Sequence, residues 1–168
     1  MKAAVLPASA SRNGSFVGIK DVPRPQVKPG FVLLRVLACG VCRTDLHIVE
    51  GDLPRPSVPR IPGHQIVGEV VEGETADLPV ATRVGVSWMG GVDGDCWYCC
   101  HNMENLCDNP TFTGYTVDGG YAEFALVRAD FVFPLPDGLD SIHAAPLLCA
   151  GIIGSAVSGS LGCNQASA

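Results

Sequence analysis

The sequence is poor in basic residues. Only 11 lysines and arginines stand against 17 aspartates and glutamates, so the formal net charge is −6 and the isoelectric point is near 5.0. Proteins that bind nucleic acid present a basic face, so this balance argues against a nucleic-acid partner. Long apolar runs are also missing, and no segment approaches the roughly 20 apolar residues that a transmembrane helix needs. We therefore expect neither nucleic acid nor a membrane as a partner.

Charged residues make up only 17% of the 168 residues, whereas 47% are hydrophobic. A domain of about 150 residues buries roughly 70% of the surface of its unfolded chain, so this composition suffices for one core. We expect a single domain over residues 1–154, followed by a loose tail at 155–168 that is rich in serine, glycine and alanine. The apolar start at residues 1–10 is too short for a signal peptide, and we expect a cytoplasmic protein.

Cysteine, in contrast, is abundant, with eight residues. Asp93, Cys96 and Cys99 follow one another at intervals of three, and Cys107 comes after seven intervening residues. Such spacing lets one loop supply the four donors of a tetrahedral zinc ion, with a carboxylate in place of one thiolate. Cys100 remains an alternative ligand. A loop of free or disulfide-bonded thiols is the alternative interpretation, which we disfavour because nothing else in the chain is typical of a secreted protein.

A second, more dispersed set contains only three donors, Cys42, His64 and Cys149. Three protein ligands leave the fourth position of a zinc ion for water or substrate, which a catalytic zinc requires. Thr44 and His47 follow the first ligand by two and five residues. A hydroxyl and an imidazole at this spacing can carry a proton away from the site.

Short strands separated by proline and glycine dominate the rest of the chain. Aliphatic or alternating runs predict strands at residues 2–6, 31–38, 66–71, 83–86 and 121–127. Short strands with turns between them suggest a small barrel, so the predicted fold class is mainly β.

Two helices are expected, and each would position a predicted ligand. One covers residues 44–49 and begins beside Cys42, and the other runs through 143–150, capped by Asp140 or Ser141, and points Cys149 inward. The segment 87–115 is too long for an ordinary irregular connection, and a zinc ion would explain how it is ordered.

Five motifs follow one another along residues 2–154: Gly40-Val41-Cys42-Arg43-Thr44-Asp45-Leu46-His47, Gly63-His64, Glu104-Asn105-Leu106-Cys107, Gly119-Gly120-Tyr121-Ala122-Glu123 and Leu148-Cys149-Ala150-Gly151. Together they resemble the catalytic domain of the zinc-dependent medium-chain alcohol dehydrogenases. The resemblance implies a GroES-like, partly open β-barrel with a few short helices and a zinc-ordered loop. It implies an NAD(P)-dependent enzyme that interconverts small alcohols and the matching aldehydes or ketones, with two zinc ions per chain.

The resemblance also implies a role for each residue near the three-donor set. Thr44 and His47 would form the proton relay, and His47 is the one cofactor-binding residue expected in this chain. Asp45 would orient the ligand His64 from behind. Trp88 would line the substrate pocket.

Three features depart from the family's pattern. Gln65 follows the zinc-binding histidine where glutamate is usual, which removes a negative charge near the metal. Asp93 stands where cysteine is commoner, and its harder oxygen is expected to weaken that site.

The third departure is an absence: residues 155–168 carry no Gly-x-Gly-x-x-Gly fingerprint, so the sequence indicates no NAD(P) site. We therefore expect a truncated form with little activity alone, whose exposed cleft wall favours self-association.

The alternative function is a non-catalytic, zinc-stabilised GroES-like module that binds another molecule. A quinone-reductase relative, which shares the barrel without zinc, is disfavoured by the two ligand sets. The remaining thiols and imidazoles receive ordinary structural interpretations: His101 as a solvated loop residue, His143 as a helix-start residue, Cys39 as a core thiol, and Cys163 as a free thiol on the tail.

Overall fold

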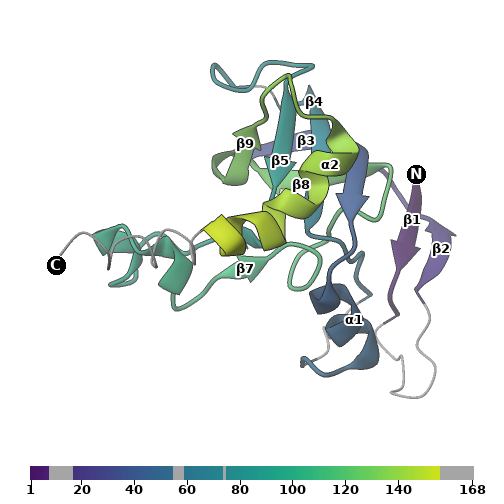
Figure 1. Ribbon diagram of the computed structural model, residues 1–168, viewed down its shortest axis with the longest axis horizontal. Helices are drawn as coiled ribbons and strands as arrows, with labels where there is room; N and C mark the ends of the chain where they lie inside the picture. The colour runs from purple at the N-terminus through teal and green to yellow at the C-terminus, as the bar shows by residue number, and fades with distance from the viewer. Residues whose placement is uncertain (8–16, 55–58, 74, 156–168) are drawn as a thin grey trace, which may run out of the picture.

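The computed structural model describes residues 1–7, 17–54, 59–73 and 75–155 of the chain. The largest element is a five-stranded antiparallel sheet in the order β8-β3-β4-β5-β9 (Figure 1). Its strands are β3 (Phe31–Gly40), β4 (Gln65–Glu72), β5 (Arg83–Val86), β8 (Phe124–Arg128) and β9 (Val132–Pro134).

Two small ribbons accompany this sheet, β1 (Lys2–Val5) with β2 (Gly18–Asp21) and β6 (Met89–Gly91) with β7 (Thr111–Phe112). Backbone hydrogen bonds join β1 to the segment before β8: the Ala4 N–H donates to the Tyr121 carbonyl at 2.7 Å, and the Glu123 N–H donates to the Lys2 carbonyl at 3.1 Å. The architecture is therefore mainly β with an open sheet, which confirms the predicted fold class.

Apolar side chains cover both faces of the central strands. Val32, Leu33 and Leu34 in β3 are all 0% exposed. One face packs into a cluster of Val32, Leu34, Ile66, Val70, Leu78, Val84, Val86, Ala125, Val127 and Val132. On the other face, Val67 of β4 contacts Ala144, Ala145 and Leu148 from the C-terminal helical segment. Burial on both sides explains why the central strands appear in the sequence as continuous apolar runs.

Helix α1 (Arg43–Glu50) starts three residues after the end of β3. Its N-cap is Cys42, and a reciprocal capping box links Cys42 to Asp45. The helix ends at Gly51, whose φ of 80° is readily adopted only by a residue without a side chain. A predicted metal ligand thus caps the helix, next to the end of a central strand.

Helix α2 (Ser141–Pro146) crosses the sheet and continues as a π-helical turn at Leu147–Gly151. Of the two predicted caps, Asp140 is the one in place, because its carboxylate accepts from the Ile142 and His143 N–H groups. The sequence predicted one regular helix to residue 150. Pro146 has no N–H to continue the α-helical ladder, and the wider turn follows it.

The predicted strands are all present, with ends that differ by a few residues. The four strands that were not predicted, β2, β6, β7 and β9, have only two to four residues each. Segment 87–115 holds β6, β7 and two 3₁₀ turns at Cys99–His101 and Glu104–Leu106. In the part of the chain that the structure describes, every helix is too short or too polar to span a membrane. Most of the predicted tail, with Cys163, lies outside the described residues.

The sheet core gives a direct test of the fold. Leu34→Ala removes a side chain that is 0% exposed, whereas Leu37→Ala changes a side chain on the same strand that is 37% exposed. We expect Leu34→Ala to lower the free energy of unfolding by about 2–5 kcal/mol. We expect less than about 1 kcal/mol for Leu37→Ala, because little apolar surface is lost. Urea unfolding measures both, and equal losses would contradict this packing.

Candidate metal centres and active site

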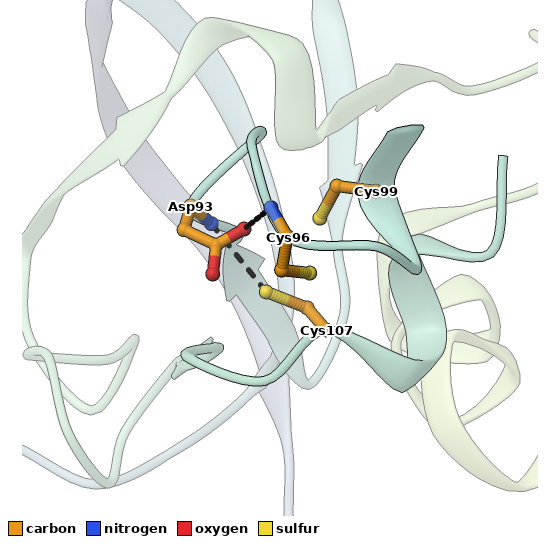
Figure 2. Close-up of side chains that lie close together, drawn as sticks. All are labelled: Asp93, Cys96, Cys99 and Cys107. Carbon is orange, nitrogen blue, oxygen red and sulfur yellow. Dashed lines mark hydrogen bonds between the residues drawn. The ribbon is translucent and has the colours of Figure 1, made fainter. Parts of the chain in front are cut away.

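The four predicted donors of the cysteine-rich loop converge on one point. One ligand atom from each of Asp93, Cys96, Cys99 and Cys107 lies within 4.8 Å of every other. Figure 2 shows the Asp93 carboxylate and the three sulfur atoms turned toward a common centre. We call this group the closed site. The loop lies at one end of the molecule, away from the five-stranded sheet (Figure 1).

Local backbone bonds hold the closed site in shape. Gly94 turns the chain with a φ of 82°, so that the Asp93 Oδ1 accepts the Cys96 N–H at 3.2 Å. The Cys107 sulfur accepts N–H groups from Asp93 at 3.5 Å and from Asn109 at 3.4 Å. These bonds fix the direction in which the Cys107 sulfur points.

Electrostatics at the closed site favour a cation. The Asn109 amide donates to Asp93 Oδ2 at 3.0 Å and, with further bonds from Cys96 and Cys99, holds the pKa of Asp93 well below its usual value. Loss of hydration and the neighbouring Cys96, Asp93 and Cys107 raise the pKa of Cys99 to about 12. Four donors that repel one another when ionised fit a divalent ion, which would make each of them an attractive contact.

The other side chains of this loop stand apart from the closed site. Cys100 is exposed, and its sulfur donates to the Asp95 carbonyl at 3.5 Å. His101 stacks on Trp97, with ring centroids 4.2 Å apart, and bonds to the Trp97 carbonyl. Every cysteine that the structure describes is a free thiol. The geometry therefore groups Asp93, not Cys100, with the three converging thiols.

The dispersed donors also meet, and we call this group the open site. Cys42 follows β3, His64 directly precedes β4, and Cys149 lies in the π-helical turn. Their ligand atoms lie within 4.8 Å of one another, and the two sulfurs are 3.8 Å apart. His64 is 1% exposed, and neither of its ring nitrogens has a hydrogen-bond partner among the described residues. Such orphaned nitrogens are rare in a folded protein, and here a metal would satisfy one of them.

Asp45 is a buried carboxylate that connects the segments carrying the ligands Cys42 and His64. It is only 4% exposed, and its two oxygens accept the N–H groups of Cys42 at 2.9 Å and Gly63 at 3.1 Å. Its Oδ1 also lies 3.6 Å from His64 Nδ1. Burial raises the pKa of Asp45, but the nearby His64 imidazole and the Cys42 N–H outweigh burial and hold the pKa below its usual value. Asp45 is therefore an anion that fixes the position of both neighbours.

The same interactions set the charge states of the ligands. Burial lowers the pKa of His64, but the carboxylate of Asp45 and the nearby Cys42 raise it by more. Burial raises the pKa of Cys42, but bonds from Thr44 and Cys149 and the charge of His64 bring it below its usual value. The pKa of Cys149 is raised by burial and by Cys42. These opposite shifts, in two sulfurs 3.8 Å apart, mean that Cys42 ionises more readily than Cys149.

Thr44 and His47 lie on α1 beside the open site. The Thr44 Oγ1 is 3.7 Å from the Cys42 sulfur. The His47 side chain is 38% exposed, and its Nδ1 lies 2.8 Å from the Asp52 Oδ2. Thr44 therefore lies next to a ligand of the open site, and His47 lies nearer the solvent on the same helix.

An aromatic wall borders the open site. Trp88 meets the His64 ring edge-on, with centroids 5.1 Å apart, and stacks on Phe112 at 4.9 Å and on Tyr115 at 5.9 Å. The Tyr115 hydroxyl donates to the Pro54 carbonyl at 2.7 Å. The sequence indicated only Trp88. Phe112 and Tyr115 lie more than 20 residues further on, and only the β6-β7 ribbon brings them to it.

Comparisons with known proteins agree with this architecture. Residues 28–137 match the family model of the alcohol dehydrogenase GroES-like domain. The chain is 45% identical over 155 residues to an alcohol dehydrogenase of Geobacillus stearothermophilus. It superposes on a cinnamyl alcohol dehydrogenase of Sorghum bicolor with a TM-score of 0.80 and 28% identity, over 97% of this chain and 47% of that one. An acetophenone reductase of Geotrichum candidum in complex with NAD gives 0.75 and 33%, over 88% and 43%.

The match covers 90% of this chain but 44% of the Geobacillus enzyme, so the chain spans less than half the length of the relatives that it matches. The family model nevertheless covers most of the chain, and the relatives with solved structures share its fold. The resemblance suggested by the sequence motifs is confirmed. This chain belongs to the alcohol dehydrogenase GroES-like domain family.

Proposed function

We propose that residues 1–154 are the zinc-binding catalytic domain of an NAD(P)-dependent alcohol dehydrogenase. The observation that carries the proposal is the open site: two thiols and a buried, unpartnered imidazole meet beside a hydroxyl, a second imidazole and an aromatic wall. The family relationship supports this function, since several relatives are named alcohol dehydrogenases.

In this proposal Cys42, His64 and Cys149 hold the catalytic zinc. When bound there, zinc would act as a Lewis acid on the alcohol oxygen, and the nicotinamide would accept the hydride. The chain's own contribution is to keep the ligands in place before the substrate arrives. Asp45 does this through its bonds to the Cys42 and Gly63 backbone and its contact with the His64 ring.

The proton of the alcohol would leave along α1. Thr44 Oγ1 would accept it and pass its own proton on to the Nε2 of His47. The contact of His47 Nδ1 with the Asp52 carboxylate keeps a proton on Nδ1, so Nε2 is the nitrogen that accepts. Since His47 is partly exposed, the proton can then pass to water. His47 is also the residue that we expect to contact the cofactor.

The substrate would lie against the aromatic wall of Trp88, Phe112 and Tyr115. Stacked rings offer an apolar surface and few hydrogen bonds, which suits the carbon chain or ring of a small alcohol, aldehyde or ketone. The hydroxyl end would then point toward the ligand atoms of the open site.

The closed site has a structural role in this proposal. Within residues 93–107, the described elements are two 3₁₀ turns of three residues each, so the loop has almost no core of its own. Zinc on Asp93, Cys96, Cys99 and Cys107 would supply the stabilisation that apolar packing does not provide.

The two sites should lose their zinc independently. We expect two zinc ions per chain by elemental analysis, with Cys149→Ala removing the ion of the open site and Cys107→Ala that of the closed site. Only Cys107→Ala should also make residues 93–107 sensitive to protease, because only that ion orders the loop. Cys100→Ala is the matched control and should keep both ions. A wild-type chain that carries a single ion, lost in Cys107→Ala but kept in Cys149→Ala, would rule out the catalytic proposal and favour a purely structural zinc module.

Alcohol oxidation with added NAD(P) tests the proton path. Thr44→Val keeps the shape of the side chain but removes the hydroxyl, so we expect kcat for alcohol oxidation to fall by about 10²–10⁴-fold. Thr44→Ser keeps the hydroxyl and should retain most of the activity. Both variants should keep two zinc ions. Equal activity of the valine and serine variants would show that the proton takes another route.

A further inference from the structure

The motif Gly119-Gly120-Tyr121 has no role in the proposed function. It lies between β7 and β8, far from the ligand His64 in the sequence. In the fold, its three backbone N–H groups donate to the loop that carries His64: Gly119 to the Ile61 carbonyl at 2.7 Å, Gly120 to the Gly63 carbonyl at 2.8 Å and Tyr121 to the Pro62 carbonyl at 3.0 Å. The motif therefore binds all three residues that directly precede the ligand.

Glycine lets the two segments approach this closely. A Cβ on Gly119 would lie 2.1 Å from the Gly63 carbonyl oxygen, and a Cβ on Gly63 would lie 2.7 Å from the Tyr121 ring. Gly63 also has a φ of 94°, which residues with a side chain rarely adopt. The loop before His64 is thus in direct contact with both the backbone and the ring of this motif.

The Tyr121 hydroxyl reaches the other segment that carries a ligand. It donates to the carbonyl oxygen of Gly40, the last residue of β3, at 3.2 Å. Gly40 lies two residues before Cys42, just as Pro62 lies two residues before His64. One residue therefore bonds to both segments, to one through its N–H and to the other through its hydroxyl.

Asp45 and Tyr121 make complementary bonds to these two segments. The Asp45 carboxylate accepts the N–H groups of Cys42 and Gly63, whereas Tyr121 donates to two of the carbonyl oxygens. An ionised carboxylate can only accept hydrogen bonds, so Asp45 is unable to hold the carbonyl groups. Tyr121 supplies the donors that Asp45 lacks.

We propose that Tyr121 is a positioning residue for the metal of the open site, which keeps the segments carrying Cys42 and His64 at the separation that one ion requires. The proposal rests on the metal-binding part of the proposed function. Bonds that hold the ligands in place before the ion arrives reduce the cost of ordering them on binding, and so they raise the affinity.

A purely structural role for Tyr121 is the alternative. Its ring packs against the small cluster of Ala3, Val5 and Ile61, so it also contributes to the core. Removal of the hydroxyl alone leaves this packing in place and deletes the bond to Gly40. A structural hydroxyl would affect only the stability of the metal-free protein, whereas a positioning hydroxyl would affect the affinity of one metal site.

The experiment compares Tyr121→Phe with Tyr115→Phe. The control also removes a hydroxyl that donates to a backbone carbonyl, that of Pro54 at 2.7 Å, but Pro54 is not close to a predicted ligand in the sequence. Zinc affinity is measured by competition with a chromophoric chelator, and Cys149→Ala, which lacks the open site, assigns each affinity to its site. Tm is measured without metal.

We expect Tyr121→Phe to weaken zinc binding at the open site by about 10-fold, the lower end of the usual effect of losing a residue that supports a ligand. The closed site should keep its affinity. Tyr115→Phe should leave both affinities unchanged. The two variants should lower the metal-free Tm by similar amounts, because each loses one hydroxyl bond.

Cobalt(II) bound at the open site reports on ligand geometry independently of stability. Its d–d bands should shift in Tyr121→Phe, because the segments that carry Cys42 and His64 are no longer joined through the hydroxyl. The bands should stay as in the wild type in Tyr115→Phe.

The outcomes separate this proposal from the function on which it rests. A wild-type chain without an ion at the open site would overturn both. A wild-type chain with two ions, in which Tyr121→Phe keeps full zinc affinity and the wild-type cobalt spectrum, would overturn the role of Tyr121 alone. An equal loss of affinity at both sites, or a loss that Tyr115→Phe reproduces, would identify a general effect on folding and would also contradict the proposal.

Discussion

Mutual repulsion among donor atoms is the constraint on which the structure depends. Each site gathers thiols with an imidazole or a carboxylate until their ligand atoms lie within 4.8 Å of one another. Ionised thiolates at that separation repel, and a buried imidazole without a partner loses the hydrogen bonds that it makes in water. A divalent cation turns both penalties into attraction. The fold of this chain can therefore be understood as a sheet and a loop that bring these donors together.

The sheet positions the open site because two of its three ligands lie next to the ends of neighbouring strands. Cys42 lies two residues after the last residue of β3, and His64 immediately precedes β4, its antiparallel neighbour. Cys149 comes from the opposite end of the chain, on a turn whose Leu148 packs against Val67 of β4. Asp45 then ties the first two ligands together. Rigid elements thus hold each ligand, as a preorganised metal site requires.

Local patterns explain which parts of this account followed from the sequence. The ligands of the closed site lie within 15 residues, so their spacing was enough to group them. The open site could be anticipated because its three donor types match a zinc ion and because the surrounding motifs resemble a family. Strands such as 31–38 and 66–71 were predictable because both of their faces are apolar.

Other features depend on contacts between residues far apart in the sequence. The pairing of Gly40 with Gln65 requires the register of β3 on β4, which includes two bulge-like shifts. The aromatic wall depends on the β6-β7 ribbon, whose strands are too short to leave a pattern. Sequence spacing contains none of this information.

X-ray absorption at the zinc edge of the intact protein tests the central claim most directly. The account predicts two zinc environments in equal amounts, one with three sulfurs and an oxygen and one with two sulfurs and a nitrogen, with zinc–sulfur distances of about 2.3 Å. Cys149→Ala should leave only the first of these. A spectrum without sulfur neighbours, or one that Cys149→Ala does not change, would contradict the account.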